Sequence, residues 1–110
     1  MLTNPLQKFI ESQVGAMQEN VAKAMAELEI ATVESSVGGG VVRCQMTGSG
    51  QLLEIKIDPS VVKSDDVELL EDLVTAAVRD CAAKAQGLKK EKLMAATPLG
   101  ALGVDVPDVF

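Results

Sequence analysis

Two segments of the chain place their apolar residues three and four positions apart, the spacing of an amphipathic helix. Residues 5–30 follow Asn4 and Pro5, which suit the cap and the first position of a helix. Residues 65–94 follow Ser64, and either Ser64 or Asp65 is the predicted cap. The first stripe contains Leu6, Ile10, Val14, Met17, Val21, Ala24 or Met25, and Leu28, and the second contains Leu70, Leu73 or Val74, Ala77, Cys81, Ala85 and Leu88. The pattern predicts two long helices.

Between these segments the apolar period changes to two residues, which predicts strands at 32–37, 41–47 and 52–58. The inward residues are Val42, Cys44 and Met46 on the second strand and Leu53, Ile55 and Ile57 on the third. A two-residue turn at Gly48-Ser49 would place Arg43 opposite Glu54 and Cys44 opposite Leu53. The expected fold is an α+β domain of order α-β-β-β-α with a three-stranded antiparallel sheet.

The predicted helices are long for a single domain of 110 residues. At 1.5 Å per residue they span about 39 and 45 Å, whereas a compact domain of this size has a radius of gyration near ~13 Å. They must therefore protrude, and an apolar stripe on a protruding helix needs a partner. We expect a homodimer with paired helical arms, and an irregular tail over residues 95–110, where two prolines and two glycines exclude a long helix.

Composition narrows the chemistry. The chain has no histidine, which excludes His-containing zinc sites and His-based acid–base catalysis, and Cys44 and Cys81 both fall on apolar faces as structural thiols. Gly38-Gly39-Gly40 is followed by Val41-Val42 instead of the Lys-Ser/Thr of a phosphate loop, so it predicts a turn. The acids of residues 65–72 favour the positive end of a helix, with a metal site as the weaker alternative. We predict no enzyme, no metal and no cofactor.

Neither a membrane span nor a secretion signal is predicted, so we expect a cytoplasmic protein. The net charge of −6 argues against nucleic acid when it is taken globally, but the charges are unevenly distributed. If the helices pack antiparallel, the start of the first and the end of the second form one tip. That tip would gather Lys8, Lys84, Lys89, Lys90 and Lys92 against Glu11 and Glu91. Lysines also favour any helix C-terminus, and charge alone leaves the two interpretations open.

Four stretches in the middle of the chain resemble the YbaB/EbfC family of nucleoid-associated proteins. They are Ser36-Val37-Gly38-Gly39-Gly40-Val41-Val42-Arg43, Gly48-Ser49-Gly50-Gln51-Leu52, Ile55-Lys56-Ile57-Asp58-Pro59-Ser60 and Leu70-Glu71-Asp72-Leu73-Val74-Thr75-Ala76-Ala77. The resemblance implies a homodimer shaped like tweezers that binds double-stranded DNA with its protruding helices. It therefore implies that Lys8, Lys84, Lys89, Lys90 and Lys92 contact DNA and that the protein is located in the nucleoid.

These observations predict a nucleoid-associated protein that contacts the duplex backbone and affects nucleoid organisation and gene expression. Sequence readout is expected to be weak, because the chain has no Trp or Tyr to wedge between bases and little Arg to read guanine. The alternative is a protein-interaction or chaperone-like adaptor, in which the apolar arms hold a peptide or partner helix.

Overall fold

The structure, a computed structural model, describes residues 4–97. Along the chain it consists of α1 (Pro5–Ile30), β1 (Thr32–Val37), β2 (Val42–Thr47), β3 (Leu52–Ile57), the short 3-10 helix η1 (Pro59–Val61) and α2 (Val67–Ala95). The predicted order of two helices around three strands is confirmed. Of the predicted irregular tail, Ala95 belongs to α2, and residues 98–110 lie outside the described residues.

The helix starts show how closely a cap can be predicted. At α1 the side chain of Asn4 accepts a hydrogen bond from the backbone N–H of Leu6 at 3.0 Å, as expected. At α2 the cap is Asp66, whose carboxylate accepts from the N–H of Leu69 at 3.3 Å. The predicted caps Ser64 and Asp65 were therefore wrong, because several neighbouring acids could each cap the same helix and only the folded backbone selects one.

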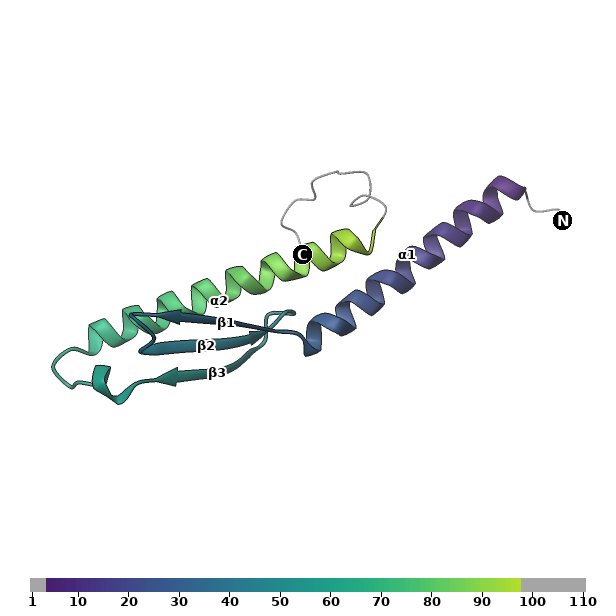
Figure 1. Cartoon of the computed structure of the whole chain (residues 1–110). Helices are drawn as coiled ribbons and strands as arrows, with labels where there is room; N and C mark the ends of the chain where they lie inside the picture. The colour runs from purple at the N-terminus through teal and green to yellow at the C-terminus, as the bar shows by residue number, and fades with distance from the viewer. Residues whose placement is uncertain (1–3, 98–110) are drawn as a thin grey trace.

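The sheet is antiparallel in the order β1-β2-β3, and α2 packs across β1 and β2 (Figure 1). The core lies between them and consists of Val42, Cys44, Met46, Ala77, Cys81 and Ala85. Small side chains on α2 allow the helix to approach the sheet closely. Both cysteines are free and buried, as predicted, and burial together with a hydrogen bond that the Cys81 thiol donates to Cys44 raises the pKa of that thiol to about 11.

The pairing of β2 with β3 differs from the prediction. Arg43 lies opposite Lys56, and Cys44 lies opposite Ile55, so the predicted partners Glu54 and Leu53 were wrong. Before the turn region the difference is two residues, which leaves the side chains of residues 42–45 and 54–57 on their predicted faces. A β-bulge between Gln45 and Met46 then offsets the strands near their turn.

The turn itself explains the shift. Thr47 bonds to Gln51 twice, through its N–H to the Gln51 carbonyl (2.8 Å) and through its Oγ1, which accepts the Gln51 N–H (3.0 Å). The loop is thus longer than two residues, and the positive φ of 97° falls at Gly50 instead of Gly48. Gly48 is required for another reason: a Cβ there would lie 2.8 Å from Cδ2 of Leu28. The turn packs directly against the end of α1.

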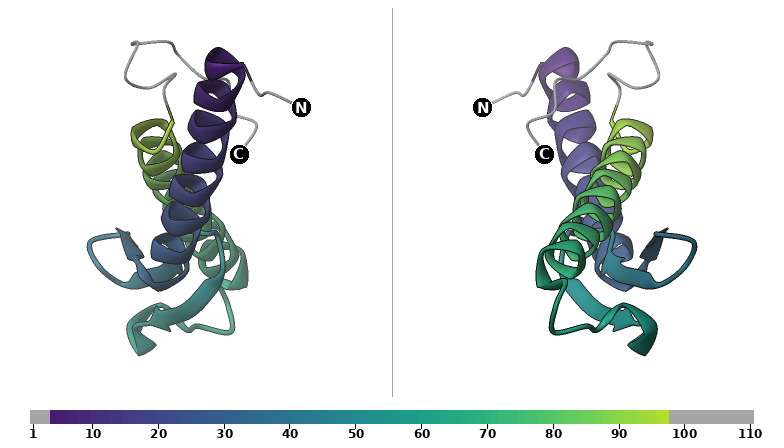
Figure 2. Two further views of the ribbon diagram at one scale, coloured as in Figure 1. Left: turned by 90° about the vertical axis from the view of Figure 1, so that its right-hand side faces the viewer. Right: turned by 90° about the vertical axis from the view of Figure 1, so that its left-hand side faces the viewer.

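The molecule is elongated, as the helix lengths predicted. It measures 77 × 23 × 18 Å and has a radius of gyration of 20.3 Å, well above the ~13 Å of a compact domain. Figures 1 and 2 show α1 leaving the end of the sheet and running away from it. Among the 26 residues of α1, only Ala24 and Leu28 are buried.

Candidate nucleic-acid interface

Charge changes sign along α2. Residues 67–80 contain four acids and one Arg, whereas residues 81–95 contain four Lys and one Glu. The first half is therefore −3 and the second half +3. The second half carries Lys84, Lys89, Lys90 and Lys92, four of the five lysines that the sequence singled out. This half of α2 is the most basic part of the described structure.

Lys84 is tied to the sheet. Its ammonium donates to the backbone carbonyl of Glu34 on β1 at 2.9 Å and lies 3.7 Å from the Asp80 carboxylate. Asp80 in turn accepts a hydrogen bond from the hydroxyl of Ser35. Together these contacts hold α2 against β1. The positive charge of Lys84 is therefore partly neutralised within the chain.

Lys92 joins the two helices. Its ammonium lies 3.2 Å from the carboxylate of Glu27 on α1. Glu27 stands near the end of α1, so this contact fixes the level at which the helices meet. Lys90, two positions earlier, is half-buried.

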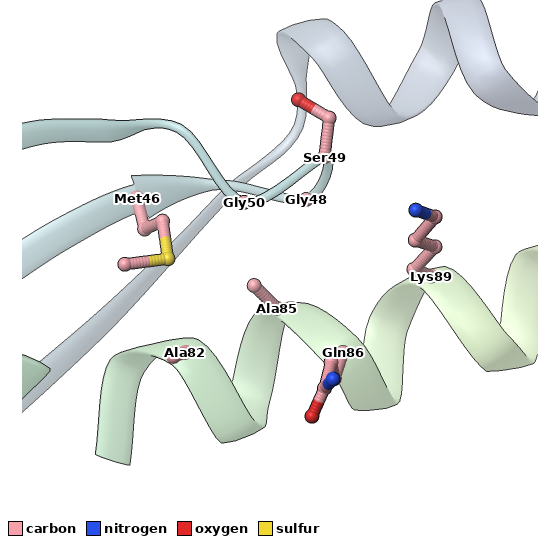
Figure 3. A pocket seen from close by; sticks show the side chains of 8 residues that line it. All are labelled: Met46, Gly48, Ser49, Gly50, Ala82, Ala85, Gln86 and Lys89. Atoms are coloured by element: carbon pink, nitrogen blue, oxygen red, sulfur yellow. The ribbon is translucent and has the colours of Figure 1, made fainter. Parts of the chain in front are cut away.

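Lys89 occupies a different environment. It lines a hollow of about 320 Å³ between α2 and the β2–β3 turn, together with Met46, Gly48, Ser49, Gly50, Ala82, Ala85 and Gln86. Figure 3 shows its side chain reaching from α2 toward the turn. Among residues 4–97 its ammonium has no hydrogen bond or ion pair, and no carboxylate lines the hollow. Its full charge is available to an external anion.

Lys8 stands apart from the other four. Lys92 contacts Glu27 of α1, and Lys8 lies 19 residues before Glu27, about 28 Å away along the α1 axis. The projecting residues 5–16 contain only one other charge, Glu11. The expectation that all five lysines gather at one tip was therefore wrong, because Lys92 meets α1 near its C-terminal end whereas Lys8 stands near its start.

Lys23 was not among the predicted DNA contacts. This residue lies on α1 beside the end of α2 and lines a hollow with Asn20, Ala24, Glu27, Ala95 and Ala96. It adds a positive charge close to the basic half of α2. The position of Lys23 relative to α2 depends on how far the two helices overlap. The apolar periodicity of a single helix does not predict that overlap.

Two apolar surfaces lie open in the described structure. The first is on the projecting part of α1, where Leu6, Phe9, Ile10 and Val14 are 63, 61, 53 and 45% exposed. The second is on β3, where Leu53 and Ile57 remain 49 and 38% exposed because α2 covers β1 and β2. Isolated exposed apolar residues are ordinary, but clusters of this kind mark interaction surfaces. No described helix is long and apolar enough to cross a membrane, and no metal-binding cluster is found within residues 4–97.

Residues 5–101 match the YbaB/EbfC DNA-binding family. The chain belongs to this family. It is 44% identical over 92 residues to a nucleoid-associated protein of Dictyoglomus turgidum, covering 84% of this chain and 86% of that protein. A nucleoid-associated protein of Syntrophobacter fumaroxidans is 40% identical over 106 residues, covering 94% and 86%.

A solved structure supports the fold. An uncharacterized protein from Helicobacter pylori, HP0035, superimposes with a TM-score of 0.68 at 20% identity, covering 82% of this chain and 92% of that one. At this identity the likeness concerns the fold alone. The match to the YbaB/EbfC DNA-binding family confirms the resemblance drawn from the glycine turn and the Ile-Asp-Pro segment.

Proposed function

We propose that this YbaB/EbfC protein is a nucleoid-associated homodimer that binds double-stranded DNA mainly through the phosphate backbone. Family membership supports DNA as the ligand, and the basic second half of α2 supports phosphate as the group contacted. In this proposal the protein is located in the nucleoid and affects nucleoid organisation and gene expression.

The proposed DNA-contacting residues are Lys8, Lys84, Lys89, Lys90 and Lys92. The contacts that each lysine already makes within the chain predict how much it contributes to DNA affinity. Lys89 and Lys8 have no described intrachain partner, whereas Lys84 and Lys92 each pair with a carboxylate. A lysine that is already paired gains less from a phosphate, because the new contact competes with the existing one. Lys89 should therefore contribute more to DNA affinity than Lys84.

The open apolar surfaces support the proposed homodimer. Neither α1 nor β3 can cover the other within one chain, because α1 leads away from the sheet (Figure 1). A second copy offers the same surfaces and can bury them, which is the usual way in which symmetric dimers form. Two copies would also double the number of lysines that face a duplex.

A direct test changes Lys89, Lys90 and Lys92 together to Glu and measures duplex binding at near-physiological salt. Binding should be abolished, because three charges per chain are reversed in the proposed interface and phosphate contacts supply most non-specific affinity. A control variant changes Lys63 and Arg79, two exposed cations outside the proposed interface, to Glu and should retain most binding. Unchanged binding by the first variant would show that DNA contacts another surface.

A second function is favoured by one observation. The projecting residues 5–16 of α1 are apolar on one side and have no net charge, which suits a partner helix better than DNA. In this adaptor role, replacement of Phe9 and Ile10 by Ser would remove partner capture in a pull-down while leaving DNA binding intact. The lysine variants above would have the opposite effects.

A further inference from the structure

The corrected register creates a basic pair on the sheet. Arg43 lies directly opposite Lys56, on the face of the sheet that α2 does not cover, because their neighbours Val42 and Cys44 point into the core. Like charges directly opposite each other destabilise an antiparallel pair. The ammonium of Lys56 forms an ion pair with the carboxylate of Glu54 at 3.4 Å, but Arg43 has no hydrogen bond or ion pair among residues 4–97. Arg43 and Lys56 therefore repel each other, and a bound anion would reduce this repulsion.

The glycine turn leaves room beside this pair. Gly38, Gly39 and Gly40 have φ values of 63°, 74° and 98°, which side chains rarely tolerate. A Cβ on Gly40 would lie 3.9 Å from Nη2 of Arg43, so the guanidinium rests beside the bare backbone of the turn. A hollow of about 200 Å³ opens there, lined by Gly40, Val41, Arg43, Lys56, Ile57 and Asp58.

The nearby carboxylates restrict what can bind. Asp58 accepts a hydrogen bond from the N–H of Ser60 at 2.8 Å, which lowers the pKa of Asp58 and keeps it charged. Glu34 and Glu54 line a smaller hollow on the other side of Arg43. A weakly held monovalent anion would not overcome these charges. A phosphate group can, since its oxygens accept two parallel N–H bonds from one guanidinium.

We propose that Arg43, Lys56 and the glycine turn form a second phosphate-binding site, remote from the lysines of α2. Arg43 grips two phosphate oxygens, and Lys56 supplies a second positive charge. The site lies one strand length, about 20 Å, from the turn beside Lys89. Its ligand is a phosphate monoester or diester, carried either by a small phosphate compound or by DNA. The DNA case rests on the proposed function.

The test follows backbone amide signals by NMR during titration with inorganic phosphate. Signals of Gly39, Gly40 and Val41 should shift and saturate in the unmodified protein. Arg43→Gln should weaken this binding at least about tenfold, the equivalent of one charge-assisted hydrogen bond. Arg79→Gln is the matched control, because Arg79 is an exposed arginine on α2 and its loss changes the net charge equally. It should bind phosphate as the unmodified protein does.

Lys56→Gln tests whether weaker phosphate binding could result from a loss of folding stability. It removes the repulsion and, with it, only an exposed ion pair with Glu54 that contributes little, so this variant should fold about as stably as the unmodified protein while binding phosphate more weakly. If the turn signals do not respond to phosphate, or if Arg43→Gln and Arg79→Gln respond alike, the site does not exist.

A duplex titration identifies the source of the phosphate. If duplex shifts the same turn signals and Arg43→Gln lowers its affinity, DNA supplies the group; if only free phosphate does so, the ligand is a small compound. The triple variant at Lys89, Lys90 and Lys92 keeps the two proposals separate. It should lose its main DNA affinity yet retain the response of Gly39 and Gly40 to inorganic phosphate.

Discussion

Arg43 and Lys56 face each other across β2 and β3, and this repulsion predicts a stabilising substitution. Arg43→Gln would remove this repulsion while keeping the contact of Lys56 with Glu54, and should raise the free energy of unfolding by about 0.2–1 kcal/mol. Urea unfolding measures the gain. Arg79→Gln is the control, because it removes the same charge outside the sheet. Equal effects of the two substitutions would contradict the observed register.

Cys81 predicts a pH dependence of stability. Burial raises the pKa of its thiol from 9.0 to about 11, so the folded state holds its proton after the unfolded chain has lost it. The stability that the protonated thiol contributes to the folded state is fully present below pH 9 and is lost as the pH rises from about 9 to 11. In urea unfolding across this range, the unmodified protein should lose more stability than Cys81→Ala, which lacks the group. Parallel curves would argue against a buried thiol.

At the scale of elements, Gly48 fixes how the β2–β3 turn meets the helices. Its Cβ would lie 2.8 Å from Leu28 and 3.1 Å from Leu88. Gly48→Ala should therefore lower the free energy of unfolding by about 1–3 kcal/mol through overpacking. Gly87→Ala is the contrasting variant, because a Cβ there meets nothing within 4 Å. It should stabilise α2 by about 0.8–1 kcal/mol, and thermal unfolding of both variants should show opposite shifts.

The elements also show what the sequence can and cannot specify. Helices, strands and their inward faces were predictable because apolar periodicity is a local property of the chain. The register was not, since it depends on Thr47 bonding to Gln51 around the turn. The arrangement of the lysines was not either, because the contact of Lys92 with Glu27 sets the overlap of the two helices. That overlap is decided by tertiary packing.

For the whole molecule, the exposed arms predict association. Sedimentation equilibrium at micromolar concentration should give a particle of two 11.5 kDa chains. Replacing Leu53 and Ile57 by Ser should shift the equilibrium toward monomer, because these residues form the open apolar face of β3. Replacing the equally exposed polar residues Glu68 and Glu71 by Ser is the control. A monomer in every sample would contradict the proposed homodimer.

The salt dependence of duplex affinity tests the central claim most directly. If about five phosphates are neutralised by lysine, the logarithm of the association constant should fall against the logarithm of salt concentration with a slope of roughly −4 to −5. Fluorescence anisotropy with one labelled duplex between 50 and 200 mM salt would measure it. A slope in that range, reduced in Lys89→Gln more than in Lys84→Gln, is the predicted result. An affinity that does not change with salt would contradict binding through the phosphate backbone.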